Sequence, residues 1–133
     1  MAGADPVDPK RVEALLNATF EHEQRVPIPI TVEFVDTETI TELNAVHRDR
    51  PRATDVLSFP FDESFPQGSG GQVIVCEAEA ARGAGELGRP LPEHLDRLIV
   101  HGALHVLGYK DETPEQLAKM ERRTDAIVKR VHG

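Results

Sequence analysis

The sequence is short of several residue types, and each shortage narrows the classes of protein to consider. It contains one cysteine, Cys76, which excludes an internal disulfide and is typical of a reducing cytoplasm. It has no run of about 18 apolar residues, so a membrane-spanning helix is not expected, and its start lacks the pattern of a secretory signal. With no tryptophan and one tyrosine, an extensive base-stacking platform is not expected either. These absences predict a cytoplasmic protein.

Positive charge is also scarce. The chain carries 15 lysines and arginines against 23 aspartates and glutamates, for a formal net charge of −8. A generic polyanion binder is therefore not expected, and contact with nucleic acid would need a local basic cluster. The length of 133 residues predicts a single domain spanning residues 1–133.

Hydrophobic periodicity predicts an alternation of helices and strands. The predicted helices cover about 9–23, a short segment from Thr37, a weak alanine-rich segment over 78–87, and two stronger segments over 90–108 and 113–131. The predicted strands cover 30–36, 55–61 and 72–78. The predicted fold class is therefore α+β, a small mixed β-sheet of three to four strands packed with about five helices.

Turn and capping residues predict where several of these elements end. Pro60 places its strand at a sheet edge or ends it early, because proline cannot donate to a ladder. The short glycine-rich connection to the next strand favours an antiparallel pair. Gly108 predicts the end of the helix before it. Thr113, Pro114 and Gln116 have the pattern of a capping box for the last helix.

The segment HGALHVLGYKD, residues 101–111, carries the spacing of a metal site. His101 and His105 lie four residues apart, so on a helix both imidazoles project from one face. Gly108 lets the chain turn, and Asp111 can then supply a third ligand. The spacing follows that of metzincin-type metalloproteases with a carboxylate as third ligand. Two imidazoles and a carboxylate leave a fourth position open, as in a catalytic zinc site.

We therefore predict one Zn²⁺ per chain, with other divalent transition metals as alternatives. A second interpretation is that the histidines are hydrogen-bonded core residues and that Asp111 begins the cap of the next helix. His94, two turns before His101, lies too far away to share the ion. It is interpreted first as a surface histidine, and otherwise as a residue behind the ligands or facing the substrate.

Gly102 argues against a peptidase. In HExxH enzymes a glutamate beside the first histidine accepts the proton of the attacking water. Glycine occupies that position here and costs about 1 kcal/mol relative to alanine in a helix interior. The cost indicates that another backbone or a substrate approaches the helix closely at this point.

The densest basic cluster is HRDRPRAT, residues 47–54, in which Arg48, Arg50 and Arg52 alternate. Guanidinium groups bind phosphate bidentately and stay charged at any relevant pH. A solvated loop, in which the arginines pair with Asp49 and neighbouring acids, is the alternative interpretation on composition alone.

Three segments taken in order, LNAVHRDRPRATDVLSFPF, GGQVIVCEA and HGALHVLGYKD, resemble the YbeY family of metal-dependent endoribonucleases that mature ribosomal RNA. The family pattern for the last segment is His-Gly-x-Leu-His-Leu-x-Gly-Tyr-Asp-His. The resemblance covers about residues 30–131. It implies a small mixed sheet packed with helices, in agreement with the fold class above.

The resemblance also implies roles for individual residues. His101 and His105 match the first two zinc ligands, Asp111 falls where the family has a third histidine, and Arg48 matches a cleft arginine needed for activity. Arg50 and Arg52 are interpreted as contacts to RNA phosphates.

Three positions depart from the family pattern. Asp111 is an anionic ligand in place of a neutral one, Gln72 replaces an acidic residue, and His47 replaces a tyrosine. These changes leave the metal prediction standing and motivate an alternative in which the protein binds without cleaving.

The function expected from the resemblance is that of a zinc-dependent endoribonuclease specific for single-stranded RNA. Its partners would be precursor ribosomal RNA and ribosomal particles, in maturation of the 16S 3′ end and in ribosome quality control. The alternative from another class is a ribosome-associated binding factor with a structural metal and little catalysis. A zinc peptidase is the third hypothesis. Oligomeric state is left open.

Overall fold

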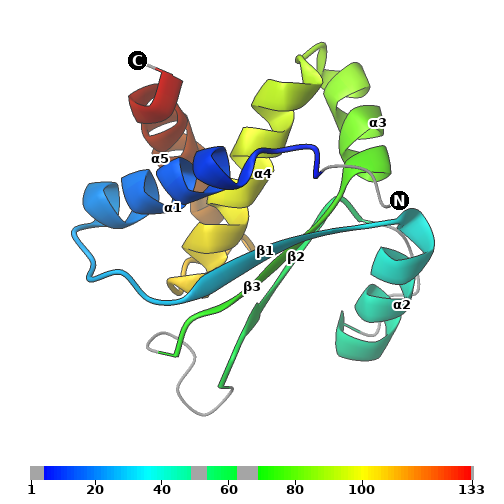
Figure 1. The fold of residues 1–133 in the computed structure, drawn as a ribbon, viewed down its shortest axis with the longest axis horizontal. Coiled ribbons are helices and arrows are strands. Elements are labelled where there is room, and N and C mark those ends of the chain that lie inside the picture. The colour runs from blue at the N-terminus through cyan, green and yellow to red at the C-terminus, as the bar shows by residue number, and fades with distance from the viewer. Residues whose placement is uncertain (1–4, 49–53, 63–68, 133) are drawn as a thin grey trace.

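The computed structural model describes residues 5–48, 54–62 and 69–132, with the side chain of Arg48 left out. Within these ranges the chain forms five helices and three strands (Figure 1). In chain order they are α1 Pro9–Glu23, β1 Ile30–Val35, α2 Thr37–Arg48, β2 Val56–Pro60, β3 Gly71–Cys76, α3 Glu77–Leu87, α4 Leu91–Val106 and α5 Pro114–His132.

The strands form one mixed sheet in the order β1-β3-β2. Strand β1 runs parallel to β3, with Val32 opposite Val73, while β2 runs antiparallel to β3, with Ser58 opposite Val73. The antiparallel pair predicted from the short connection is confirmed. Pro60 is the last residue of the edge strand β2, as predicted for a residue that cannot donate to a ladder.

The two faces of the sheet are covered by different helices. Because successive side chains of a strand point to opposite faces, Val73 and Val75 of β3 enter the larger core with α4, while Ile74 and Cys76 enter a smaller one with Ile40 of α2. Figure 1 shows α4 against the sheet with α1 and α5 beyond it, and α2 on the opposite side. The sheet therefore separates α2 from the three-helix layer.

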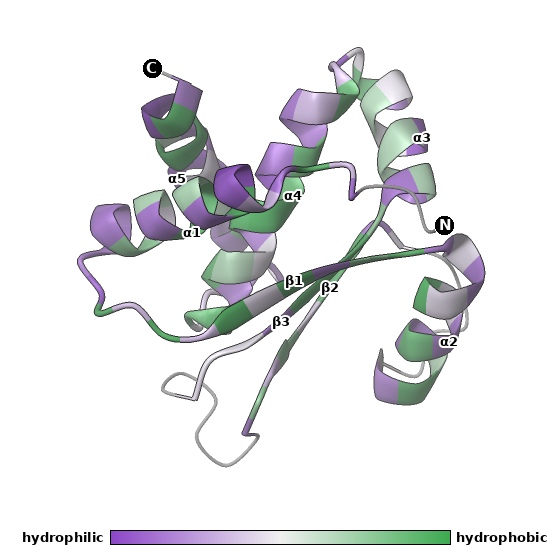
Figure 2. Ribbon diagram, viewed as in Figure 1, coloured by the Kyte–Doolittle hydropathy of each residue, from purple (hydrophilic) through white to green (hydrophobic). Residues whose placement is uncertain are grey.

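Helix α4 is the central element of the larger core. Leu95, Ile99 and Leu104 are at most 2% exposed, and each fully buried side chain of this size stabilises the fold by roughly 1.5–3 kcal/mol. Figure 2 shows hydrophobic residues concentrated on α4 and the strands, while α1 and α5 alternate between hydrophobic and hydrophilic faces. The sheet and two helices thus fix the position of α4. Side chains at the margin of α4 are therefore attached to a rigid helix.

The predicted α+β class with three to four strands and about five helices is confirmed. In the described part of the chain, no helix has the length and apolar character needed to cross a membrane.

Candidate metal centre

Helix α4 carries the two predicted histidine ligands on its last two turns. The helix ends at the turn that Gly108 predicts. Gly108 has a φ of 107°, a backbone conformation that residues with a Cβ atom rarely adopt. The backbone N–H of Gly108 donates to the His105 carbonyl at 2.9 Å, and that of Tyr109 donates to the Leu104 carbonyl at 3.0 Å. This pair of bonds is a Schellman motif. It turns the chain back toward the face on which His101 and His105 lie.

The segment after the turn is fixed at its far end by the start of α5. The backbone N–H of Gln116 donates to Thr113 Oγ1, and the backbone N–H of Thr113 donates to Gln116 Oε1, both at 3.1 Å. This reciprocal pair is the predicted capping box. The N–H of Glu112 also donates to Gln116 Oε1, at 3.0 Å. Asp111 therefore sits on a short segment held between two helix ends.

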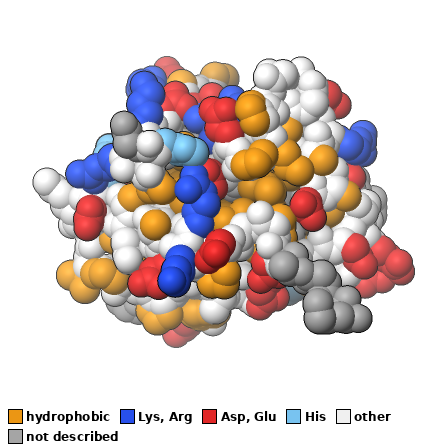
Figure 3. Space-filling view, turned by 45° about the horizontal axis from the view of Figure 1, so that its top comes forward, with side chains coloured by type: hydrophobic (Ala, Val, Ile, Leu, Met, Phe, Trp, Pro, Cys, Tyr) orange, Lys and Arg blue, Asp and Glu red, His pale blue; other side chains and the backbone are white. Residues whose placement is uncertain are grey.

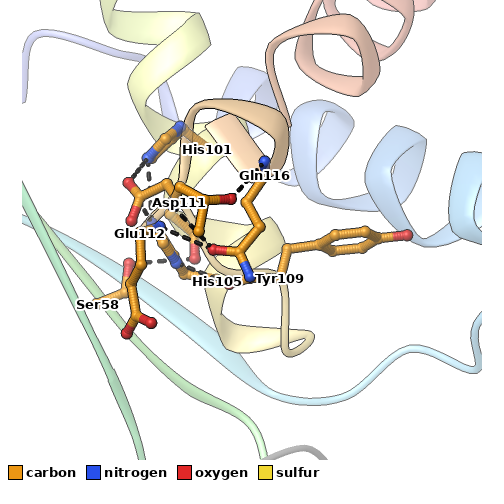
Figure 4. Close-up of polar contacts among 9 residues, drawn as sticks. Ser58, His101, His105, Tyr109, Asp111, Glu112 and Gln116 are labelled. Carbon is orange, nitrogen blue, oxygen red and sulfur yellow. Dashed lines mark hydrogen bonds and ion pairs between the residues drawn. The ribbon is translucent and has the colours of Figure 1, made fainter. Parts of the chain in front are cut away.

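His101, His105 and Asp111 point toward one another (Figure 4). His105 Nε2 lies 3.1 Å from both His101 Nε2 and Asp111 Oδ2, and the remaining separation, from His101 Nε2 to Asp111 Oδ2, is 3.3 Å. In a tetrahedral zinc site with bonds of about 2.0–2.1 Å, neighbouring ligand atoms are about 3.3–3.4 Å apart. The three atoms therefore have nearly the spacing of one triangular face of such a site.

A backbone contact determines which nitrogen of His105 is available. His105 Nδ1 lies 2.9 Å from the carbonyl oxygen of Tyr109, which can only accept a hydrogen bond. Nδ1 therefore carries the proton, and in the neutral ring Nε2 presents a lone pair to Asp111 Oδ2. Facing lone pairs repel one another unless a cation or a proton lies between them. The donor chemistry of the cluster thus fits a divalent metal.

Burial affects the ionisation of two ligands. Burial lowers the pKa of His101, and the neighbouring His105 lowers it further, against the opposing effect of Asp111. A lowered pKa keeps this imidazole neutral, as ligation requires. Burial raises the pKa of Asp111, but the two histidines outweigh it, so the net direction is downward and the carboxylate stays ionised. The cluster therefore offers the imidazole of His101 in its neutral form and an anionic oxygen from Asp111.

The cluster is open on one side. The side chains of His101, His105 and Asp111 are 21%, 27% and 38% exposed. Structural zinc sites are closed by four protein ligands, whereas catalytic sites keep a position free. Among the described residues, these three are the group of histidine, cysteine and acidic side chains that could hold an ion. An ion bound here would remain accessible to solvent and substrate.

A pocket of about 220 Å³ borders the metal centre. Its walls are formed by the end of edge strand β2 and by the segment from the last turn of α4 through the glycine turn. The lining residues are Ser58, Phe59, Pro60, His105, Val106, Gly108, Tyr109 and Lys110. The pocket therefore combines an apolar wall with the predicted ligand His105 and the ammonium-bearing side chain of Lys110.

Lys110 was not identified from the sequence, although the motif itself holds the signal. It occupies the place of the aspartate in the pattern His-Gly-x-Leu-His-Leu-x-Gly-Tyr-Asp-His, and Asp111 follows it in place of the histidine. The family pair has one formal negative charge, whereas Lys110 and Asp111 together have none. The negative charge that Asp111 adds in place of a histidine is thus offset by the positive charge of Lys110.

The predicted arginines of the basic loop are largely outside the described residues. This applies to Arg50, to Arg52 and to the side chain of Arg48; the backbone of Arg48 ends α2. The preceding residue, His47, has its ring centroid 4.7 Å from that of Phe59, which lines the pocket. The end of α2 is thereby placed beside edge strand β2.

Gly102 accommodates the sheet. A Cβ atom at this position would lie 2.5 Å from Val73 Cγ1 and 3.0 Å from Ser58 Oγ. Ser58 Oγ also donates to the Gly102 carbonyl at 3.1 Å. The close approach inferred from the glycine is therefore made by the side chains of Val73 and Ser58 rather than by another backbone, and in the described structure it needs no substrate.

Gln72 lies away from the metal centre. It adjoins Val73 in β3, and because Val73 contacts α4, Gln72 faces the other side of the sheet. Its Nε2 donates to Glu33 Oε1 at 3.2 Å. The absence of an acidic residue at this position does not alter the donor set of the metal site.

The interpretation of His94 as a surface histidine was wrong. The residue is 6% exposed because α3 covers this part of α4, where Gly83 leaves room for the ring. His94 Nδ1 lies 3.2 Å from Arg89 Nη1, and His94 Nε2 lies 3.7 Å from Asp55 Oδ2. Burial lowers its pKa. Periodicity places a residue on a stripe but does not show which helix covers that stripe.

Comparison with known proteins gives a consistent result. The family model described as Endoribonuclease YbeY matches residues 5–132. The Endoribonuclease YbeY of Halorhodospira halophila is 39% identical over 133 residues, covering 96% of this chain and 86% of the relative. That of Thiobacillus denitrificans is 35% identical over 132 residues, covering 98% and 87%.

A solved structure also matches over most of the chain. The solution structure of a Thermotoga maritima protein has a TM-score of 0.66 and 26% identity, covering 96% of this chain and 85% of that one. The residues of the resemblance, the fold and the family match agree with one another. The chain belongs to the Endoribonuclease YbeY family.

Proposed function

We propose that this protein is a zinc-dependent endoribonuclease that cleaves single-stranded RNA in the maturation of ribosomal RNA, including the 16S 3′ end, and in ribosome quality control. One observation carries the proposal: three ligand atoms of His101, His105 and Asp111 lie 3.1–3.3 Å apart on an accessible edge of the fold. Membership of the family supports RNA as the substrate. A cytoplasmic location and ribosomal particles as partners are part of the same proposal.

The metal and the chain contribute different chemistry. A bound zinc ion supplies a Lewis acid for a phosphoryl oxygen and a source of hydroxide at neutral pH. Arg48 neutralises the negative charge that builds on the phosphoryl oxygens during cleavage. Arg50 and Arg52 hold neighbouring backbone phosphates. The contact of His47 with Phe59 supports this arrangement, because it places the end of α2 next to the wall of the pocket.

The pocket supports a preference for single strands. Its volume of about 220 Å³ is below the roughly 300–1,000 Å³ of drug-sized sites and suits one group of a nucleotide. Phe59, Pro60 and Val106 provide an apolar wall for a base, and Lys110 provides a cation for the adjoining phosphate. A single strand can place an unstacked base there, whereas a duplex must first break pairing and stacking.

Metal analysis combined with RNA cleavage tests the proposal. The purified wild type should contain about one zinc ion per chain and cleave a single-stranded RNA much faster than a matched duplex. Arg48→Ala should retain the metal and lose most activity, while His105→Ala should lose both. Equal, metal-independent cleavage by all three proteins would contradict the proposal.

The two alternative hypotheses gain less support. A structural metal in a binding factor would favour a closed site, but all three ligand side chains are at least 21% exposed. A peptidase lacks the adjacent glutamate, because Gly102 occupies that position against Val73. Co-sedimentation with ribosomal particles without turnover would favour the binding factor. Digestion of casein would favour the peptidase.

A further inference from the structure

Tyr109 connects the metal centre to α1. Its carbonyl accepts the bond from His105 Nδ1 at 2.9 Å, while its hydroxyl donates to Glu23 Oε1. Figure 4 shows the Tyr109 ring extending away from the ligands, toward α1. One residue therefore contacts a metal ligand with its backbone and a distant carboxylate with its side chain.

Glu23 is a buried anchor. It is the last residue of α1, and its side chain is 4% exposed. Arg123 Nη1 of α5 donates to Glu23 Oε2 at 2.9 Å and to Oε1 at 3.1 Å, and His22 Nδ1 lies 2.8 Å from Oε2. Burial raises the pKa of Glu23, but bonds from Tyr109, His22 and Arg123 outweigh it, so the pKa is lowered.

The aromatic ring of Tyr109, like its hydroxyl, contacts charged side chains. The Arg123 guanidinium carbon lies 5.0 Å from the ring centroid, and Lys119 Nζ lies 5.6 Å from it. The backbone N–H of Tyr109 is fixed by the Leu104 carbonyl at 3.0 Å. With its N–H, ring and hydroxyl all engaged, Tyr109 is held with its carbonyl directed at His105 Nδ1.

We propose that Glu23, acting through Tyr109, is a positioning residue that sets the ring orientation and tautomer of His105 and thereby the affinity of the metal centre. The Tyr109 carbonyl holds the proton on Nδ1 and leaves the Nε2 lone pair for the ion. Partners behind a ligating histidine commonly change metal affinity by about 10–100-fold. The inference rests on the metal site of the proposed function, but it does not depend on the substrate.

Two variants remove the connection in different ways. Tyr109→Phe deletes the hydroxyl and keeps the ring between its cations, and Glu23→Gln keeps the shape of the carboxylate and removes its charge. Arg11→Gln is the matched control. This variant also removes an ion pair that ties α1 to α4, because Arg11 pairs with Asp96. Arg11 lies at the opposite end of α1 from Glu23.

Zinc affinity, measured by competition with a chromogenic chelator, is the first readout. We expect it to fall about 10–100-fold in Tyr109→Phe and Glu23→Gln and by less than threefold in Arg11→Gln. The second readout is the visible absorption spectrum of the cobalt-loaded protein, which reports ligand geometry. The spectrum should change in both test variants and match the wild type in the control. The melting temperature of the metal-free proteins measures structural loss separately.

The outcomes separate the possibilities. Equal zinc affinity and unchanged cobalt spectra in Tyr109→Phe would overturn the inference, as would equal losses of affinity in the test variants and the control. A wild type that binds zinc and shows these differences but does not cleave RNA would contradict the proposed function and leave this inference standing. A wild type that binds no zinc would overturn both, and the chelator titration alone would show it.

Discussion

Two polar clusters at opposite ends of α4 share a carboxylate and a histidine and differ in what accompanies them. At the first, Asp96 is 1% exposed, receives two bonds from Arg11 Nε at 2.9 and 3.1 Å, and has His132 Nε2 at 3.0 Å. At the second, Asp111 is 38% exposed, and its charged or polar partners are His101 and His105.

The difference is one of charge balance. In the first cluster the Arg11 guanidinium compensates the buried carboxylate, and Asp96 in turn raises the pKa of Arg11 through their hydrogen bonds. In the second, two imidazole nitrogens and a carboxylate oxygen converge without a permanent positive charge among them. We call the Asp96 cluster complete, because its charges are balanced, and it ties helices together. We call the cluster of His101, His105 and Asp111 incomplete, because it has no cation of its own and is suited to receive one. Similar residues therefore form a structural contact in one place and a candidate metal site in the other.

Figure 3 shows the face formed by the helices, where basic and acidic side chains are intermixed around hydrophobic ones. Such a surface produces no strong field of one sign. With a net charge of −8, the chain would have to attract the proposed RNA substrate locally, at the candidate metal centre and the cations beside it.

The largest expected effect comes from removing the charge of the incomplete cluster. Asp111→Asn keeps the shape of the side chain and deletes its negative charge, so zinc affinity should fall by about 100-fold or more, beyond the range for partners behind ligands. Stability of the metal-free protein should change by less than about 0.5 kcal/mol, because the side chain is partly exposed. Chelator competition and urea unfolding measure the two quantities. A large loss of metal-free stability would show that Asp111 is structural.

The same substitution in the complete cluster should have the opposite profile. Asp96→Asn leaves Arg11 without its counter-charge, and breaking a buried pair typically costs about 3–5 kcal/mol. We expect about 2–4 kcal/mol, because the Arg11 side chain is 37% exposed and water can partly solvate it. Zinc affinity should stay within threefold of the wild type. The distinction between the two clusters would be wrong if Asp111→Asn and Asp96→Asn both lowered zinc affinity, or both lowered the free energy of unfolding.

The parts of the metal centre that the sequence predicted depend on short-range signals. His101 and His105 share a helical face, Gly108 ends the helix, and the Thr113–Gln116 capping box begins the next one. Each relation spans a few residues, where helix geometry alone fixes the outcome. The carboxyl ligand lies between two such signals, so its approach to the histidines followed from them.

The parts that the sequence could not predict depend on contacts between distant segments. Glu23 and Tyr109 are 86 positions apart, and nothing in the periodicity of α1 marks its last residue as an anchor. His94 was misjudged for the same reason, because its burial depends on packing against α3. The pocket beside β2 likewise requires the strand and the glycine turn to meet in space. Tertiary packing determines all three.

Gly102 lies on α4 between the two clusters. Its replacement by alanine is expected to have an intermediate effect on the free energy of unfolding. In Gly102→Ala the added Cβ would meet Val73 Cγ1 at 2.5 Å, and overpacking of this kind costs about 1–3 kcal/mol against a gain of about 1 kcal/mol in helix propensity. We expect a net loss of up to about 2 kcal/mol in urea unfolding and a change in zinc affinity of less than fivefold. Unchanged stability together with a raised KM would instead mean that substrate occupies the space beside the glycine.

The smallest expected effect concerns Lys110, which lines the pocket beside the candidate metal centre. Lys110→Gln should raise KM for single-stranded RNA about 2–5-fold, as for the loss of up to about 1 kcal/mol from an exposed charge, and leave kcat and zinc content near wild type. The slope of log affinity against log salt should become shallower by about 0.7, the value for one phosphate contact on a single strand. Lys129→Gln, in the last turn of α5, is the matched control and should change neither quantity. Equal slopes in the two variants would show that Lys110 does not contact phosphate. The open charge balance of the metal centre would then have to be met by the ion and the basic loop alone.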